Sequence, residues 1–269
     1  MSTTDAWTRV VIDAAAERPD ADLLRRLAHG ETAVVVLRNL LPAEAFADNR
    51  TRIGKLFANA STTSYANGAL TTIGPYLAKY LQDLDGYFQA ADEAKGMLDA
   101  ADFDLADQVR ARLRDAFGLD AVSVAQEPDG RDYAASVVRI HADGVRNPLH
   151  NDNIMRDAQG TGIALTGLAY QLSCVVCLQE CDGGGELRMY RKPWEPADET
   201  YKIQDGLGYD EAVVDGYPCH EFKPQTGDVY LINPMQYHSI ERVTGSDRLT
   251  MGFFMGFGTD TLNSAVVWG

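Results

Sequence analysis

Two histidines and one aspartate are the residues of this sequence whose types and spacing could do chemistry. One residue separates His150 from Asp152, and His238 lies far downstream. Two imidazoles and a carboxylate that bind one face of a metal ion, leaving the opposite face open, are the ligands of non-haem iron(II) oxygenases. Alternate side chains of an extended strand point to the same side, so His150 and Asp152 can reach one ion while Asn151 points away. The pattern predicts a metal site that His238 completes from a neighbouring strand.

Arg248 and Thr250 form a second polar pair, at the start of an apolar strand that follows His238. Because they alternate, both point to one face of the strand while Leu249 packs behind. A buried guanidinium beside a hydroxyl can hold a carboxylate through charge-assisted hydrogen bonds. The alternative for Arg248 is a structural salt bridge.

Taken in order, these residues resemble the pattern of iron(II)- and 2-oxoglutarate-dependent oxygenases: His-x-Asp, a distal His, and Arg-x-Ser/Thr. From about Tyr133 to the C-terminus, the sequence is similar to a stand-alone subgroup that hydroxylates or halogenates small molecules. Its substrates include free and N-substituted amino acids and indole alkaloids. The similarity rests on Gln171-Leu172-Ser173, Gly184-Gly185-Glu186-Leu187, Tyr190, Trp194, Pro196, Gly227-Asp228 and Trp268.

The resemblance implies a role for each residue of the two motifs. His150, Asp152 and His238 would bind iron(II), and Arg248 with Thr250 would anchor the far carboxylate of 2-oxoglutarate, with O2 as the third reactant. Halogenases of this subgroup carry Gly or Ala at the position of Asp152, which frees a coordination site for halide. Since this chain keeps the carboxylate, the resemblance implies hydroxylation of an unactivated C–H bond with release of succinate and CO2.

Short β-strands are the elements that must position these residues. From Tyr133 onward, short apolar runs are separated by Gly, Pro, Asn and Asp, a pattern typical of a sandwich or jelly roll. Residues 1–130 show helical spacing of apolar residues, with one early strand at 33–37. We expect a mainly β fold: a double-stranded β-helix (jelly roll, cupin-like) core over 131–269, and a mostly helical flank over 1–130 packed on the outer sheet. The irregular stretch 192–218 is a candidate active-site loop.

Length and composition fit one extended domain. The chain has 269 residues, 45% of them hydrophobic, so we expect residues 1–269 to share one core. No apolar run approaches the roughly 18 residues that span a bilayer, and residues 1–5 lack the features of a signal peptide. We therefore expect a cytoplasmic protein without membrane association. The 24 basic and 39 acidic residues give a net charge of -15, which argues against nucleic-acid binding.

Other motifs have simpler explanations. Cys174 and Cys177 are spaced as in some zinc sites, but residues three apart in a strand face opposite sides and cannot share one tetrahedral ion. The glycines at 183–185 are interpreted as a tight turn, because no helix start or Lys-Ser/Thr follows them. His29, His141 and His220 are interpreted as structural histidines, although His141 could line the pocket.

A free amino acid is the expected substrate, with a basic one such as lysine preferred because the chain is acidic. By position alone, the candidate substrate-binding residues are Asp132, Asn153, His141 and Trp268. Three alternative substrates for the same chemistry are an N-substituted amino acid, a nucleoside and a natural-product scaffold. A fourth alternative is a non-catalytic module that binds a metal or 2-oxoglutarate. The sequence does not indicate the oligomeric state.

Overall fold

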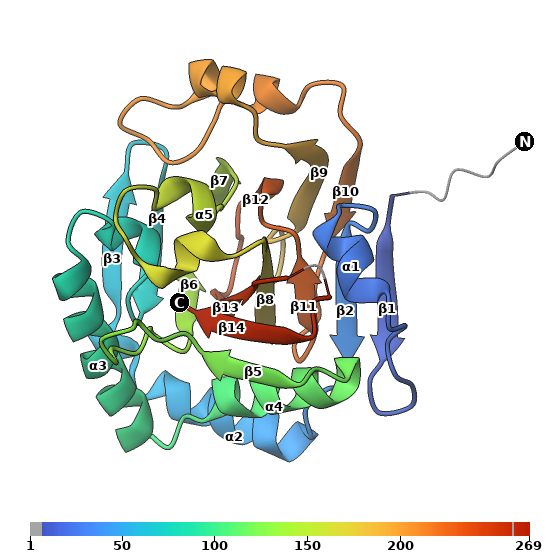
Figure 1. Cartoon of the computed structure of the whole chain (residues 1–269), viewed down its shortest axis with the longest axis vertical. Helices are drawn as coiled ribbons and strands as arrows, with labels where there is room; N and C mark the ends of the chain where they lie inside the picture. Colours follow the sequence, from blue (N-terminus) through green and yellow to red (C-terminus); the bar gives the residue numbers. More distant parts are fainter. Residues whose placement is uncertain (1–6, 260) are drawn as a thin grey trace, which may run out of the picture.

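Strands β6 to β13 fold into two facing sheets, which form the double-stranded β-helix that the sequence predicts (Figure 1). The structure is a computed structural model that describes residues 7–259 and 261–269. The major sheet contains, as neighbours, β11 (Val229–Ile232), β8 (Tyr170–Gln179), β13 (Arg248–Phe257) and β6 (Val137–His141). The 4-stranded minor sheet has the order β10 (Cys219–Phe222), β9 (Leu187–Pro193), β12 (Gln236–Ile240) and β7 (Asn147–His150).

The central strands β8 and β13 have two different faces. One face of β13 carries Leu249, Met251 and Phe253 into the large apolar core, and Cys174 of β8 joins them there. The opposite face looks into the space between the two sheets. Antiparallel pairing of β13 with β6 sets Arg248 opposite His141 and Thr250 opposite Arg139. Because the side-chain period of a strand is two, this register places all four polar residues on the inner wall.

The first 130 residues are a helical flank only in part, which corrects the sequence-based expectation. β1 (Arg9–Asp13) and β2 (Val34–Arg38) extend the major sheet beside β11, while β4 (Gly68–Ile73) and β3 (Ser61–Tyr65) extend it beside β6. Two further strands, β5 (Ala121–Val124) and β14 (Ser264–Trp268), pair with each other, and β14 also pairs with β13. Of the strands in the first 130 residues, the sequence predicted only β2. The β3 sequence, Ser-Thr-Thr-Ser-Tyr, lacks the apolar alternation that marks a half-buried strand.

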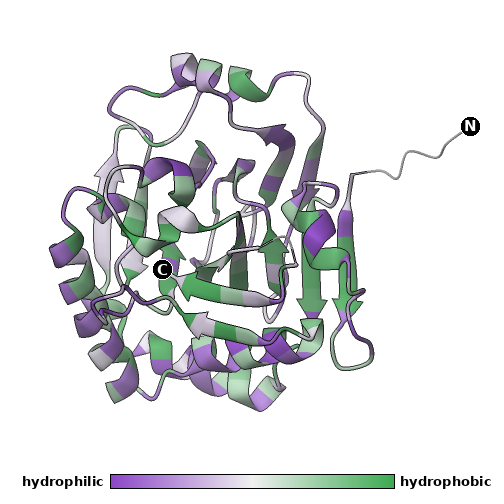
Figure 2. Cartoon of the chain, in the orientation of Figure 1, coloured by the Kyte–Doolittle hydropathy of each residue, from purple (hydrophilic) through white to green (hydrophobic). Residues whose placement is uncertain are grey.

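The helices cover the outer face of the major sheet, as expected. They are α1 (Leu23–Ala28), α2 (Ala43–Gly54), α3 (Leu84–Ala100) and α4 (Leu105–Phe117). The short α5 (Ile154–Asp157) follows β7 instead and borders the cavity between the sheets. Leu105, Val109 and Leu113 lie four residues apart on α4, and all three are buried in the core that lines β8 and β13. Figure 2 shows the polar residues of α3 and α4 on their outer sides and apolar residues along the sheet. The 3-10 helices are η1 (Phe57–Asn59), η2 (Leu77–Tyr80), η3 (Ala164–Gly167), η4 (Pro196–Tyr201) and η5 (Glu211–Val214).

Residues 194–218, which we call the covering segment, lie over the edge of the minor sheet (orange, top of Figure 1). The Tyr209 N–H donates to the carbonyl oxygen of Leu149 at 2.8 Å, so the segment lies against β7. Gly208 has φ +77, and a Cβ there would lie 1.9 Å from the same carbonyl oxygen. Only glycine allows this approach. The segment falls within the stretch that the sequence predicts as an active-site loop.

The remaining expectations concern the cysteine pair, a membrane span, a signal peptide and the number of domains. Cys174 is buried in the core, whereas Cys177 lies beside Glu180 on the other face of β8, so the two thiols do not share a site. Among the described residues, no helix combines the length and the apolar character needed to cross a membrane. Residues 1–5, on which the expected lack of a signal peptide rested, lie outside the described part of the chain. That residues 1–269 form one domain stays a prediction.

Candidate active site

The three expected metal ligands converge where β7 and β12 pair. His150 ends β7 and lies opposite His238 of β12, and Asp152 is the second residue after β7. Asp152 Oδ2 is 3.8 Å from Nε2 of His150 and 3.7 Å from Nε2 of His238. One donor atom of each residue lies within 4.8 Å of the other two. Since metal–ligand bonds are about 2.1 Å long, small rotations of these side chains bring all three donors onto one ion.

Both histidines present Nε2 to this point because Nδ1 is engaged elsewhere. Nδ1 of His150 donates to the carbonyl oxygen of Pro148 at 2.7 Å, and Nδ1 of His238 donates to that of Gln236 at 3.0 Å. A carbonyl only accepts, so each Nδ1 carries the proton and each Nε2 keeps its lone pair. Burial, and then the neighbouring His150, lower the pKa of His238 to about 4. This imidazole is therefore neutral, as a metal ligand must be.

Tyr76 orients the third ligand. Its hydroxyl donates to Oδ1 of Asp152 at 2.8 Å, which leaves Oδ2 facing the two histidines. The Asp152 N–H also donates to the carbonyl oxygen of Pro234 at 2.8 Å. Burial and the Asp152 charge raise the pKa of Tyr76, so the phenol stays protonated and keeps donating. Nothing in the sequence spacing indicates this contact, because Tyr76 precedes η2 in a segment far from the motif.

Arg248 lies on the facing wall, with 1% of its surface exposed. Its Nε donates to Oε1 of Glu180 at 3.1 Å, and its Nη2 donates to the Tyr230 hydroxyl at 3.1 Å. Its Nη1 makes no hydrogen bond with any residue that the structure describes, although the group borders the cavity. A Cβ on Gly185 would lie 3.1 Å from Cδ of Arg248, so the glycine turn at 183–185 makes room for this side chain. The structural salt bridge that the sequence analysis gave as the alternative for Arg248 thus exists, and it leaves Nη1 of the guanidinium free for a ligand.

His141 adds a second unpartnered group at this wall. It is 2% exposed, and neither ring nitrogen has a hydrogen-bond partner among the described residues. Burial, and then the Arg248 charge, lower its pKa to about 3, so the ring is neutral. Buried polar atoms are normally paired, so this ring is expected to bond a ligand, and its one N–H can donate to a carboxylate oxygen. Arg248, Thr250 and His141 thus fit the far carboxylate of 2-oxoglutarate, and the His-Asp-His donor set fits iron(II).

A cavity of about 500 Å³ joins the two walls, a size that suits a small organic molecule. The expected ligands His150, Asp152 and His238 line it together with Arg248 and Thr250. Its other lining side chains include aromatic, aliphatic and cationic residues, among them Tyr65, Leu70, Tyr76, Lys79, Arg139, Arg156, Val175, Leu187, Lys202, Tyr209, Tyr230, Ile232, Ile240 and Phe254. The covering segment contributes Lys202, Leu207, Gly208 and Tyr209.

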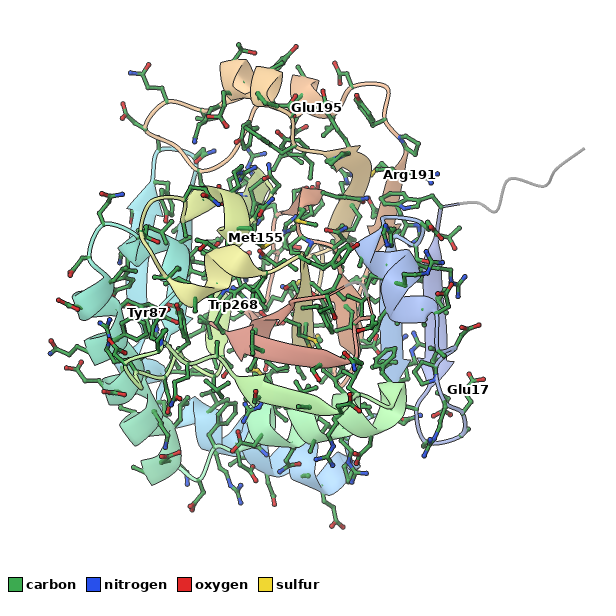
Figure 3. All side chains as sticks on the ribbon, in the orientation of Figure 1. Glu17, Tyr87, Met155, Arg191, Glu195 and Trp268 are labelled. Atoms are coloured by element: carbon green, nitrogen blue, oxygen red, sulfur yellow. The ribbon has the colours of Figure 1, made fainter. Side chains whose placement is uncertain are left out.

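Of the four candidate substrate residues, only His141 lines the cavity. Asp132 is exposed, and its Oδ1 accepts a hydrogen bond from Nε2 of Gln126 at 2.9 Å. Asn153 caps α5 by accepting from the Arg156 N–H at 3.1 Å. Trp268, at the end of β14 in Figure 3, is buried one layer behind the cavity wall, where its ring lies 5.6 Å from that of Phe254. The structure therefore does not bring Asp132, Asn153 and Trp268 to the cavity lining, and their part in substrate binding stays a prediction from the sequence.

The sequence interpretation missed Tyr76, Glu180 and Arg139. The alternation Arg139-x-His141 in an apolar run was a usable signal, because it puts two polar side chains on one face of a strand. Glu180 directly follows β8 and carries no such signal.

Comparison with known proteins agrees with this site. A family model described as carrier-protein-independent halogenase WelO5 matches residues 5–269. Leucinostatins biosynthesis cluster protein S from Purpureocillium lilacinum is 29% identical over 183 residues, which cover 64% of this chain and 72% of that protein. L-gamma-glutamyl-L-propargylglycine hydroxylase from Streptantibioticus cattleyicolor is 30% identical over 128 residues, covering 47% of this chain and 46% of that protein.

The fold is also found among solved structures. An N-substituted L-amino acid dioxygenase from Burkholderia ambifaria AMMD superposes with a TM-score of 0.59 at 19% identity, covering 93% of this chain and 91% of that chain. A second structure of that dioxygenase, in complex with alpha-KG, gives a TM-score of 0.57.

Fold, donor set and similarity together define an iron(II)- and 2-oxoglutarate-dependent oxygenase, which uses O2 as its oxidant. Within that class, the chain belongs to the family of the carrier-protein-independent halogenase WelO5.

Proposed function

We propose that this oxygenase hydroxylates an unactivated C–H bond of an amino acid, either free or N-substituted, and releases succinate and CO2. The observation that carries the proposal is the Asp152 carboxylate. Its Oδ2 faces Nε2 of both histidines, and its Oδ1 is held by Tyr76. A carboxylate fixed in this way occupies the coordination position that a halide would need.

Each wall of the cavity has a distinct task in this proposal. His150, Asp152 and His238 would hold iron(II), which with 2-oxoglutarate and O2 supplies the oxidizing power for C–H cleavage. Arg248, Thr250 and His141 would hold the far carboxylate of 2-oxoglutarate, since all three line the cavity and the His141 ring has no other hydrogen-bond partner among the described residues. Phe254 and the covering segment would close the substrate end and exclude water.

The charges of the cavity favour an amino acid with a free carboxylate and weigh against lysine. The basic residues that line it are Lys79, Arg139, Arg156, Lys202 and Arg248, whereas its acidic lining residues are Asp152 and Asp157. Asp152 faces the metal site, and Asp157 pairs with Arg156 at 2.5 Å. A cationic side chain would find no unpaired carboxylate among these lining residues. The acidity of the whole chain is thus not repeated in its cavity.

Halogenation is the second candidate, because the matching family model carries that name. A natural-product scaffold also stays a candidate substrate, since one relative is named as a biosynthesis cluster protein.

The test is a turnover assay with iron(II), 2-oxoglutarate and O2 in the presence of chloride and bromide. Free L-amino acids, their N-acyl derivatives and larger scaffolds are offered separately, and succinate and product masses are measured. We expect succinate formation coupled to an amino acid that gains one oxygen atom. A product that carries halogen from the wild-type protein would overturn the hydroxylase assignment, and coupling only to a larger scaffold would overturn the substrate assignment.

Asp152→Gly provides the matched variant. Removing the carboxylate opens the position beside His150 and His238, so hydroxylation is expected to fall by at least about a hundredfold. If halogenated product appears only in this variant, the carboxylate decides between the two reactions. Tyr76→Phe, which keeps the ligand but removes its hydrogen bond, is expected to show a smaller loss of hydroxylation and no halogenation.

A further inference from the structure

We propose that Arg139 is a carboxylate-binding residue at the metal end of the cavity, so that the site receives an anion there in addition to the one at Arg248. This inference deepens the proposed function and rests on it for the identity of the cavity as the site of reaction. It assigns a ligand to a guanidinium that forms no hydrogen bond and no ion pair with the residues that the structure describes.

The position of Arg139 follows from the strand register. On β6, Arg139 and His141 point to the same side, one strand repeat of about 7 Å apart. Thr250 lies opposite Arg139, as Arg248 lies opposite His141. Arg139 is therefore one step further from the Arg248 end of the wall, and Cζ of its guanidinium lies 6.0 Å from the centre of the Tyr76 ring. Tyr76 in turn binds Asp152, so Arg139 is on the side of the metal ligands.

Arg139 has no partner of opposite charge. Its side chain forms no hydrogen bond and no ion pair with any residue in the ranges 7–259 and 261–269 that the structure describes. By contrast, the cavity's other guanidinium groups are each paired, Arg156 with Asp157 and Arg248 with Glu180. Arg139 is only partly exposed and borders the cavity. A guanidinium kept unpaired in a partly buried site is costly unless a ligand supplies the acceptor.

The surroundings of Arg139 favour a carboxylate over other ligands. The planar fork of an arginine matches two carboxylate oxygens, and the Thr250 hydroxyl across the strand pair offers a further donor. Two lysines at the cavity, Lys79 and Lys202, are exposed and add positive charge. In a chain of net charge -15, this local excess attracts anions to the cavity.

Two carboxylates could reach Arg139. One belongs to the amino acid substrate, and the other is the 2-oxoglutarate carboxylate next to the keto group, since Arg248 serves the far end. Both have the same chemistry, and separate binding measurements distinguish them.

The experiment uses the full chain loaded with nickel(II), which allows binding to be measured without turnover. Calorimetric titrations with 2-oxoglutarate are followed, at saturating 2-oxoglutarate, by titrations with L-amino acids and N-acetyl-L-amino acids, each beside its carboxamide. We expect Arg139→Gln to weaken the binding of 2-oxoglutarate or of the carboxylate probes by at least about tenfold. Arg139→Lys, which keeps the charge and loses the fork, is expected to lie between Arg139→Gln and the wild type.

Two controls make the result decisive. Arg112→Gln changes the net charge equally at an exposed position of α4 outside the cavity, and it should leave all affinities unchanged. Carboxamide probes should bind the wild type no better than Arg139→Gln if the substrate carboxylate is the ligand. The proposal would be overturned if Arg139→Gln bound 2-oxoglutarate as tightly as the wild type does and if, in addition, the carboxylate probes bound both proteins equally tightly or bound neither protein. Because no turnover is measured, these outcomes do not depend on whether the enzyme hydroxylates or halogenates.

Discussion

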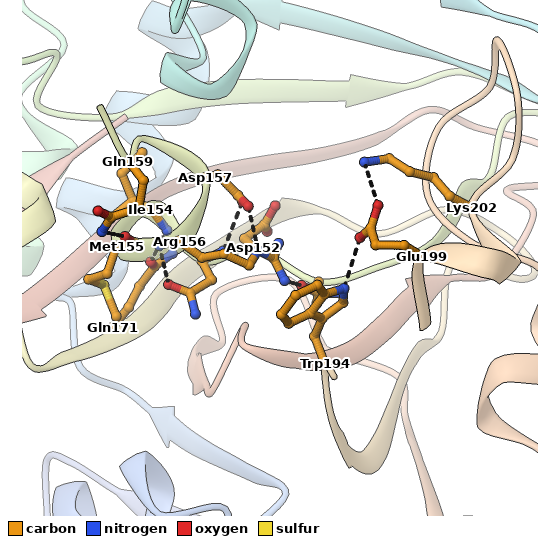
Figure 4. Close-up of polar contacts among 12 residues, drawn as sticks. Asp152, Ile154, Met155, Arg156, Asp157, Gln159, Gln171, Trp194, Glu199 and Lys202 are labelled. Atoms are coloured by element: carbon orange, nitrogen blue, oxygen red, sulfur yellow. Dashed lines mark hydrogen bonds and ion pairs between the residues drawn. The ribbon is translucent and has the colours of Figure 1, made fainter. Parts of the chain in front are cut away.

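The inner wall of the major sheet and the covering segment enclose the same cavity by different means. On the wall, β13 is buried along its entire length, and its pairing with β6 and β8 places Arg248 and Thr250 by register. The covering segment packs the buried side chains of Tyr209, Val213 and Val214 against β7 and β12 and buries an ion pair between Asp198 and Lys192, while its outer part has exposed polar contacts. In Figure 4, the Trp194 indole N–H donates to Glu199 at 3.0 Å, Lys202 donates to the other oxygen of Glu199, and the Arg156 guanidinium lies 4.5 Å from the Trp194 ring centre.

This difference between the inner wall and the covering segment suggests that different parts of the cavity determine the reaction and the choice of substrate. A side chain placed by strand register cannot shift without moving a sheet, so the groups for metal and 2-oxoglutarate are held rigidly. The exposed contacts among Trp194, Glu199 and Lys202 contribute little free energy each, so this outer part of the covering segment can change its sequence at small cost. We therefore infer that the wall sets the reaction class and the covering segment selects the substrate.

His238→Ala tests the rigid part and should have the largest effect. Removing one of two imidazoles on the metal is expected to abolish iron binding and to lower turnover below detection. Iron content and succinate formation measure this. His220→Ala is the matched control, because His220 lies on β10 of the same sheet and outside the cavity. If His238→Ala retained stoichiometric iron and activity, the metal site would have to be placed elsewhere.

Arg248→Lys tests the opposite wall and should have the next largest effect. Lysine keeps the charge but has a single nitrogen in place of the planar fork, so it cannot reproduce the geometry that joins Glu180, Tyr230 and a carboxylate. We expect the KM for 2-oxoglutarate to rise at least about tenfold, with a smaller change in the KM for the amino acid. Arg112→Lys, on the exposed face of α4, serves as the control. Equal rises in both KM values would argue that Arg248 supports the cavity as a whole.

The same contrast explains what the sequence could predict. His150, Asp152, His238, Arg248 and Thr250 occur in or directly beside strands whose two-residue alternation fixes side-chain direction, so spacing alone indicates which of them converge. The alternation of β8 likewise predicts that Cys174 and Cys177 face opposite ways.

Residues outside such strands were placed poorly. Asp132 and Asn153 lie in irregular segments, where position in sequence does not determine direction, and both point to local partners instead. Trp268 is in a strand, but its distance from the cavity depends on Phe254, which packs in between. Tyr76 reaches Asp152 through tertiary packing of an N-terminal segment. Contacts of this kind depend on the assembled fold and have no local pattern.

A pH series on the metal-free protein tests how deeply the wall is buried. The His141 ring titrates near pH 6.5 when unfolded and has its pKa lowered to about 3 in the folded state. Between these values the unfolded state binds one more proton, so stability falls as pH decreases below 6.5, by about 1.4 kcal/mol per pH unit.

Urea unfolding of the wild type and of His141→Gln at pH 7.5, 6 and 5 measures this difference, because the remaining titratable groups are common to both. We expect the curves of unfolding free energy against pH to diverge below pH 6.5, with the wild type falling more steeply. Parallel curves would mean that His141 is hydrated and that the wall is more open than its 2% exposure indicates.

Trp194→Ala tests the covering segment and should have the smallest effect. The change removes a hydrogen bond to Glu199 and a cation–π contact with Arg156, together worth about 1–2 kcal/mol at most at a partly exposed site. We expect the KM for the amino acid to rise a few-fold, the KM for 2-oxoglutarate to stay constant, and hydrogen exchange to accelerate only in the covering segment.

Tyr201→Ala is the control for Trp194→Ala, since it removes a 42% exposed aromatic ring from the same segment. If Trp194→Ala raised the KM for 2-oxoglutarate as much as that for the amino acid, the two regions would be energetically coupled. The covering segment would then contribute to the reaction itself, because loosening its surface contacts would be felt at Arg248 on the opposite wall. Faster exchange at β13 in the same variant would identify the sheet as the path of that coupling.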